Sequence, residues 1–132
     1  MTEFDVLGRS AATMEAQRAA LDVYAQNVAS ADARGPGGTF STLVPQLRLD
    51  TAGNLVFTGT RRVGITPRYV YAPQDPFAIQ HGAHRGYVAR SSIDVLTEMV
   101  AALDAGRAYE AGASLFDLGK RLAERAIDVG RS

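Results

Sequence analysis

Apolar residues recur every three or four positions at both ends of the chain, and this spacing limits the possible folds more than any other feature. Near the N-terminus the series comprises Phe4, Leu7, Ala11, Met14, Leu21, Ala25 and Val28, interrupted once by Arg18. Such spacing is typical of a helix that packs along a partner helix. Thr2 and Asp5 have the spacing of a capping box, and Gly35 with Pro36 ends the pattern. The sequence therefore predicts a helix over residues 4–33, about 45 Å long.

A second, longer helix is predicted over residues 92–130, with Ser91 and Asp94 in capping-box spacing and Gly130 at its end. One apolar stripe along it comprises Val95, Met99, Ala102, Gly106, Tyr109, Ala113, Phe116, Lys120, Ala123 and Ile127. An adjacent stripe comprises Leu96, Val100, Leu103, Leu115, Leu118, Leu122 and Val129. Two neighbouring stripes make a face wider than one partner helix covers. We therefore expect this helix to contact more than one neighbour.

Two details of these helices bear on their partners. The centre of the second helix is rich in alanine and glycine, and each interior glycine costs about 1 kcal/mol relative to alanine. Close approach of another helix is the expected compensation. Arg18 and Lys120 occupy stripe positions, where a charge either specifies a partner or reaches out to solvent. Both alternatives remain open from the sequence.

The segment between the helices has a different character. Gly35 to Gly38 forms a loop by composition, and residues 40–49 and 55–71 have the composition of short strands, separated by a turn over residues 50–54. Pro45 places the first strand at a sheet edge or a bulge. The chain thus divides into residues 1–33, 34–91 and 92–132. The predicted fold is mainly α, with two long helices packed as a coiled coil and a short β-hairpin region between them.

Composition excludes several classes of function. The 132 residues suffice for one domain, and the 14 basic and 14 acidic residues cancel, which argues against a nucleic-acid partner. The chain has no cysteine, so disulfides and thiolate chemistry are excluded. No stretch reaches the roughly 20 apolar residues of a membrane span. The acidic N-terminus does not have the pattern of a cleaved signal peptide.

No pattern of catalytic or metal-binding residues stands out. The two histidines, His81 and His84, lie in a glycine-containing segment without the four-residue offset of a helical metal pair. The Gly35 to Gly38 run lacks the lysine of a phosphate-binding loop. We therefore expect no catalytic residue, no metal, no cofactor and no small-molecule substrate, and we interpret the chain as a protein that is not an enzyme.

Both terminal segments resemble the flagellar rod and hook proteins. Leu21–Asp32, read as LDVYAQNVASAD, resembles the family pattern LDVIANNIANAN, and Met99–Ala113, read as MVAALDAGRAYEAGA, resembles MVxMIxASRAYEANV. Lys120–Arg131 is similar to the terminal helix of that family. The short length and the Pro67 to Val88 stretch are most similar to proximal rod members. Departures include Gln26 and Ser30 where the family has asparagine, and Gly106 where it has serine.

The resemblance implies a structural subunit of the bacterial flagellar basal-body rod. It implies export by the flagellar type III apparatus without a cleaved signal peptide. It also implies assembly in the periplasmic space with copies of itself and other rod proteins, as a helical tube that transmits torque for motility. The terminal helices then pack as an inner coiled-coil layer.

Stripes and motifs together predict a protein interface. Its expected residues are Leu7, Met14, Leu21, Asn27, Val28, Val95, Met99, Leu103, Arg107, Tyr109, Phe116, Leu122 and Ile127. For Arg107 and Tyr109, ordinary helix packing with an ion pair from Arg107 to Glu110 is the competing interpretation. The alternative to a rod subunit is a small soluble helical-hairpin adaptor that binds one protein partner as a monomer or a closed dimer.

Overall fold

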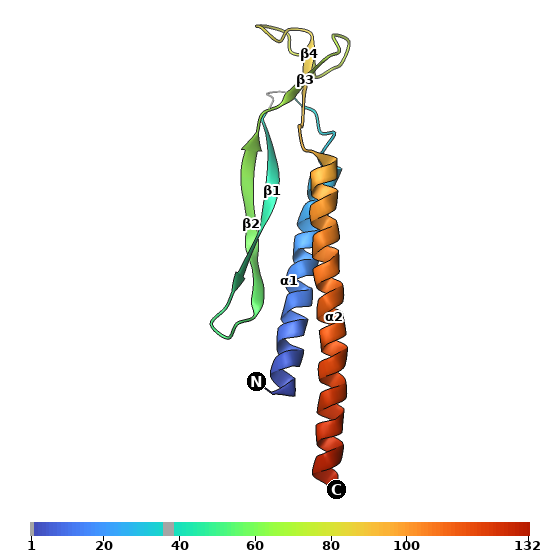
Figure 1. Cartoon of the computed structure of the whole chain (residues 1–132). Helices are drawn as coiled ribbons and strands as arrows, with labels where there is room; N and C mark the ends of the chain where they lie inside the picture. Colours follow the sequence, from blue (N-terminus) through green and yellow to red (C-terminus); the bar gives the residue numbers. More distant parts are fainter. Residues whose placement is uncertain (1, 36–38) are drawn as a thin grey trace.

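The computed structural model of the chain describes residues 2–35 and 39–132. Its elements are α1 (Glu3–Ala29), β1 (Phe40–Leu49), β2 (Leu55–Ile65), β3 (Arg68–Tyr71), β4 (Tyr87–Arg90) and α2 (Val95–Arg131). The two helices lie side by side and antiparallel, and the β1–β2 hairpin lies along α1 (Figure 1). The small β3–β4 sheet lies at the end where α1 finishes and α2 begins. Two long helices around a β insert agree with the predicted fold class.

α1 begins with the predicted capping box, but it ends earlier than predicted. Asp5 N–H donates to the Thr2 hydroxyl at 3.3 Å, and Thr2 N–H donates to the Asp5 carboxylate at 2.8 Å. These bonds lower the pKa of Asp5, with the backbone bond from Thr2 as the largest cause. The predicted extension to residue 33 is wrong, because Ser30 caps the helix. Its hydroxyl donates a hydrogen bond to the Gln26 carbonyl oxygen at 2.7 Å. The stop predicted at Pro36 lies outside the described residues.

Both predicted ends of the second helix are corrected. Asp94 caps α2 by accepting from Leu96 N–H at 3.1 Å. Ser91 is not the cap, because it continues the extended chain of β4 and donates its N–H to the Ala33 carbonyl at 2.9 Å. The helix also runs through Gly130 to Arg131, since Gly130 does not adopt the positive φ that ends a helix at glycine.

Small residues form the contact between α1 and α2. On α2 the buried residues are Ala105, Gly112, Gly119 and Ala123, and the buried Ser10 of α1 faces them at Gly112; we call these five residues the seam. A Cβ atom at Gly112 would lie 3.0 Å from Met14 Cγ and 3.3 Å from the Ser10 carbonyl oxygen. A Cβ atom at Gly119 would lie 3.3 Å from Leu7. The close helix approach predicted for the glycines in the centre of this helix is confirmed at Gly112 but not at Gly106, and it also occurs at Gly119, where it was not predicted.

The β1–β2 hairpin has the predicted first strand and turn. Its antiparallel register runs from Phe40 opposite Ile65 to Leu49 opposite Leu55, with a shift between Gln46 and Leu47 that confirms the bulge expected near Pro45. In the turn, Asp50 accepts from Asn54 N–H at 2.9 Å and Ala52 N–H at 2.8 Å. The bonds from Asn54 are the main cause that lowers the pKa of Asp50 below its usual value of 3.8.

The predicted second strand, residues 55–71, is divided in the structure. β2 ends at Ile65, and β3 begins at Arg68 after Pro67. β3 pairs antiparallel with β4, a strand that the sequence did not predict. This pairing buries Val88 and Ala89, while an ion pair from Arg34 to Asp75 ties the segment after α1 to the same unit. Within the described residues, no helix combines the length and the apolar character that a membrane crossing requires.

Candidate assembly interface

Asn27 joins three elements at the upper end of the helix pair. Its side chain is 2% exposed. The Asn27 amide nitrogen donates to the Leu43 carbonyl oxygen at 2.8 Å and to the Glu98 carboxylate at 2.9 Å, and its oxygen accepts from Leu43 N–H at 2.9 Å. One amide thus fixes β1 and the first turn of α2 against α1. These bonds lie within the chain, so both amide hydrogens of Asn27 already have partners in the single subunit.

The opposite end of the hairpin is fixed by a second long-range bond. The Arg9 guanidinium donates to the Ala52 carbonyl oxygen at 3.1 Å, next to the Gly53 turn. Arg9 and Asn27 lie at opposite ends of α1, so the hairpin is held against this helix at both ends. No helix or strand of the described residues covers the face of α2 that points away from α1, as Figure 1 shows.

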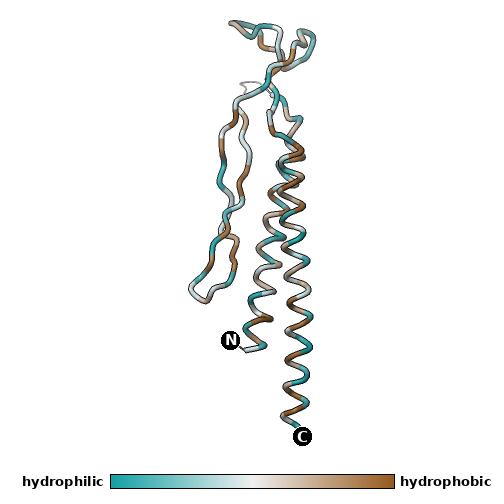
Figure 2. Tube along the Cα trace, viewed as in Figure 1, coloured by the Kyte–Doolittle hydropathy of each residue, from teal (hydrophilic) through white to brown (hydrophobic). Residues whose placement is uncertain are grey.

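Large apolar side chains remain exposed along the whole of α2. Leu103 is 61% exposed, Leu118 is 51% exposed and Val129 is 75% exposed. The full exposed set on α2 comprises Val95, Leu96, Met99, Val100, Leu103, Tyr109, Leu115, Leu118, Leu122, Ile127 and Val129. Apolar positions continue along α2 to its C-terminal end (Figure 2). The second predicted stripe is exposed throughout, whereas the first is exposed only in part and includes the buried Ala123. Together they leave a larger unpartnered surface than a helix pair usually leaves.

Two apolar grooves run along the helix pair, and they share no residues. One is lined by Leu21, Tyr24, Val28, Met99 and Ala102. The other is lined by Val6, Thr13, Ala108, Gly112 and Leu115, among others. Since α1 and α2 both contribute to each groove, the grooves flank the seam. A helix of a neighbouring subunit placed in either groove would contact both helices of this chain.

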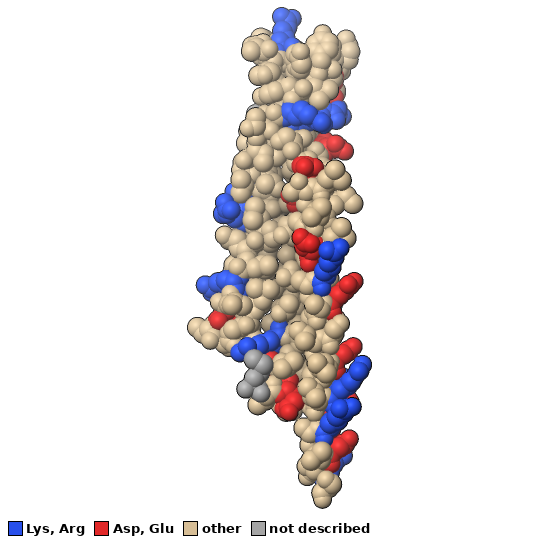
Figure 3. Space-filling model, in the orientation of Figure 1, with Lys and Arg blue, Asp and Glu red and all other residues tan. Residues whose placement is uncertain are grey.

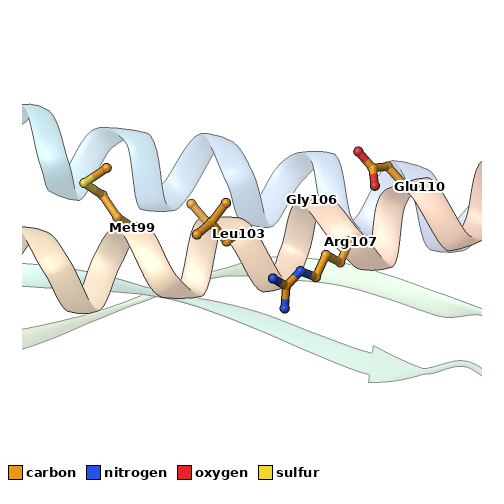
Figure 4. A pocket seen from close by; sticks show the side chains of 6 residues that line it. Met99, Leu103, Gly106, Arg107 and Glu110 are labelled. Atoms are coloured by element: carbon orange, nitrogen blue, oxygen red, sulfur yellow. The ribbon is translucent and has the colours of Figure 1, made fainter.

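A hollow of about 460 Å³ continues the first groove across α2. Its lining comprises Met99, Ala102, Leu103, Gly106, Arg107 and Glu110 (Figure 4). A Cβ atom at Gly106 would meet no atom within 4 Å, so this glycine, unlike Gly112, has no close neighbour in the chain. Arg107 and Glu110 extend away from each other at the rim. The ion pair of the competing interpretation is not formed; within the described part of the chain, the one ion pair joins Arg34 to Asp75.

The residues predicted for the interface divide by burial. Asn27 is buried, and Leu7, Met14, Leu21, Val28 and Phe116 are half-buried beside the seam. The exposed ones are Val95, Met99, Leu103, Arg107, Tyr109, Leu122 and Ile127. Met14 and Leu7 face Gly112 and Gly119 of the seam, while Leu21 and Val28 line a groove together with Met99. Arg18 and Lys120 are exposed, as expected if their charges reach solvent.

His84 takes part in aromatic packing beside the β3–β4 sheet. The His84 ring stacks on Tyr69 with 3.7 Å between ring centroids. His81 and His84 are both exposed. Across residues 2–35 and 39–132, no three His, Cys, Asp or Glu side chains gather as a metal site would require.

Comparison with known proteins gives the family. No family model matches the chain. The flagellar basal-body rod protein FlgC of Aquifex aeolicus is 33% identical over 137 residues, covering 98% of both chains. The chain belongs to the FlgC family of flagellar basal-body rod proteins. FlgC of Bacillus subtilis is 28% identical over 156 residues, covering 99% of this chain and 100% of the relative. FlgC of Salmonella typhimurium is 28% identical over 135 residues, covering 97% and 96%.

Membership of the FlgC family confirms the resemblance found in the two terminal motifs. The role that follows is structural, in the flagellar basal-body rod. Some residues that shape the interface were nevertheless missed from the sequence. In the seam, Gly119 was missed, although Ala105, Gly112 and Gly119 recur every seven residues, a spacing that could have revealed it.

Proposed function

We propose that this chain is a rod subunit that assembles with copies of itself and with other rod proteins into a helical tube. In this tube α1 and α2 pack as a coiled-coil inner layer, and the many helix contacts share the torque that drives motility. The flagellar type III apparatus exports the chain to the periplasmic space, and no signal peptide is cleaved. No catalytic, metal or cofactor role is part of the proposal.

The exposed apolar residues on α2 carry this proposal. They extend from Val95 to Val129, on more sides of the helix than the seam occupies. Burial of apolar surface contributes about 25 cal/mol per Å², so a partner that covers this helix gains substantial free energy. A single partner helix covers only one stripe. A tube, in which each subunit has several neighbours, covers both.

Replacement of Leu103 and Leu118 by serine tests the proposal in cells that depend on this chain. Both side chains are exposed in the single subunit, so each change is expected to alter its stability by less than about 0.5 kcal/mol. We expect the double variant to be exported but not incorporated, with loss of swimming and of rods in isolated basal bodies. Circular dichroism of the purified variant checks that its helix content is unchanged.

The matched control changes Asp117 and Arg121 to serine, since both are exposed on the same helix but charged. We expect cells that carry this control variant to swim. Normal swimming of the leucine variant would reject the proposed assembly. A purified chain that stays a closed dimer and never enters basal bodies would instead favour the soluble adaptor.

A further inference from the structure

No contact within the described residues explains why position 106 is a glycine. An interior glycine costs a helix about 1 kcal/mol relative to alanine. At Gly112 and Gly119 the close approach of α1 explains the choice, whereas a Cβ at Gly106 would meet nothing within 4 Å. The glycine opens the hollow between Met99, Leu103 and Glu110. A side chain from outside the chain can enter it.

The C-terminal part of α2 is the segment that most lacks a partner. Ala123 is the last buried residue of the helix, and beyond it α2 extends past the start of α1 (Figure 1). Ile127 is 53% exposed in this overhang, which we define as residues 124–131. The overhang is about 12 Å long, shorter than the roughly 17 Å of α2 that lines the hollow from Met99 to Glu110.

The charges near the hollow and those of the overhang have opposite signs when the two segments are aligned with a shift of 21 residues. Asp104, Arg107 and Glu110 are spaced by three residues with the sign order negative, positive, negative. Residues Arg125, Asp128 and Arg131 repeat the spacing with every sign reversed, and a shift of 21 residues relates the two sets. Acidic and basic residues both lie along the lower part of α2 (Figure 3). The same shift relates Gly106 to Ile127, and a multiple of seven keeps the same helix face.

We propose that the overhang of a second copy lies parallel to α2, shifted by 21 residues, with its Ile127 in the hollow at Gly106. Arg131 of the second copy then lies beside Glu110, and its Asp128 lies beside Arg107. Within residues 2–35 and 39–132, none of these four charged side chains makes an ion pair. The inference rests on the proposed function, because it describes one contact of the growing tube.

This contact joins different parts of two copies, so each copy has a free hollow or overhang left for the next. Such a heterologous interface grows without closing. Successive copies would be displaced along the helix axis by about 32 Å. An antiparallel arrangement of the two segments also opposes the charges, but it closes a dimer. The two arrangements give different products in a cross-linking experiment.

Cysteine cross-linking tests the contact cleanly, because the chain has no cysteine of its own. Gly106→Cys and Ile127→Cys are combined in one chain, expressed in cells that assemble it, and oxidised. We expect a ladder of trimers and larger species on a non-reducing gel, and no species above dimer for either single variant. The control combines Ala111→Cys with Ile127→Cys, since Ala111 is exposed but lines the other groove. We expect at least about tenfold less ladder from it.

Charge reversal gives a second measurement that does not rely on the hollow. Glu110→Arg alone places like charges together, and we expect swimming speed or rod yield to fall about tenfold. Adding Arg131→Glu should restore it. The contact would be overturned if the double-cysteine variant gave only dimers. It would also be overturned if adding Arg131→Glu did not restore swimming speed or rod yield. Swimming cells with rods but no ladder would overturn it and leave the proposed function intact, whereas absence of the native chain from rods would reject the function itself.

Discussion

Replacement of Gly112 by leucine is expected to lower the free energy of unfolding of the chain by about 3 kcal/mol. A Cβ atom at this position already lies 3.0 Å from Met14 Cγ and 3.3 Å from the Ser10 carbonyl oxygen. The Ser10 oxygen belongs to the backbone of α1 and cannot rotate away. The two helices must therefore separate, which opens the seam. Urea denaturation followed by circular dichroism measures the loss.

Gly106→Ala is the matched control for this prediction. Both glycines lie in the middle of α2, and each is replaced by a residue with a higher helix propensity. Because a Cβ at Gly106 meets nothing within 4 Å, we expect the control to gain up to about 1 kcal/mol of stability. Equal effects of the two substitutions would show that the helices do not meet at Gly112.

Asn27→Ala is expected to cost about 2 kcal/mol and to loosen the hairpin from α1. The change removes the partner of the Leu43 N–H and of its carbonyl oxygen, and leaves Glu98 without the amide. A hydrogen-bonding group left unsatisfied in a partly buried site costs about 1–3 kcal/mol. Hydrogen exchange at the Leu43 amide should become faster, together with a lower urea midpoint.

The neighbouring residue supplies the control for Asn27. Gln26 lies on the exposed side of the same helix turn, so Gln26→Ala should change stability by less than about 0.5 kcal/mol. Unchanged exchange at Leu43 in the Asn27 variant would contradict the role of this amide in holding the hairpin.

The large apolar residues predicted the helices and the α1 side of their contact, but not the α2 side. Spacing of three and four along Leu7, Met14, Leu21 and Val28 correctly indicated a long helix. On α2 the contact is built from small residues such as Gly112 and Gly119, which lie against Met14 and Leu7. Small residues give a weak apolar signal, because their importance comes from the close approach of a partner that the sequence does not reveal.

In the β insert, the turn was predicted from nearby residues, whereas the pairing of β3 with β4 was not. Asp50, Gly53 and Asn54 mark the turn of the hairpin, and their side-chain and backbone preferences act within five residues. β4 was not predicted, because it has only four residues and its stability depends on pairing with β3 across a long connection. The first helix was predicted too long for a local reason, because the Ser30 cap ends the helix before the glycine and proline that the prediction used as its end.

The candidate interface was predicted in outline from the two terminal motifs. The exposure of Leu103 and Ile127 agrees with the expected second partner of α2. The in-chain bonds of Asn27 could not be foreseen, because its partners Leu43 and Glu98 lie 16 and 71 residues away. Whether the predicted residues contact neighbouring subunits stays a prediction.

Thiol labelling at Leu118→Cys tests the central claim most directly. The cysteine would be unique in the chain, and Leu118 is 51% exposed in the single subunit. We predict rapid reaction with a maleimide in the dilute purified chain and strong protection in isolated basal bodies, because neighbouring helices cover α2 in the rod. Equal labelling in both states, or absence of the chain from basal bodies, would contradict the account.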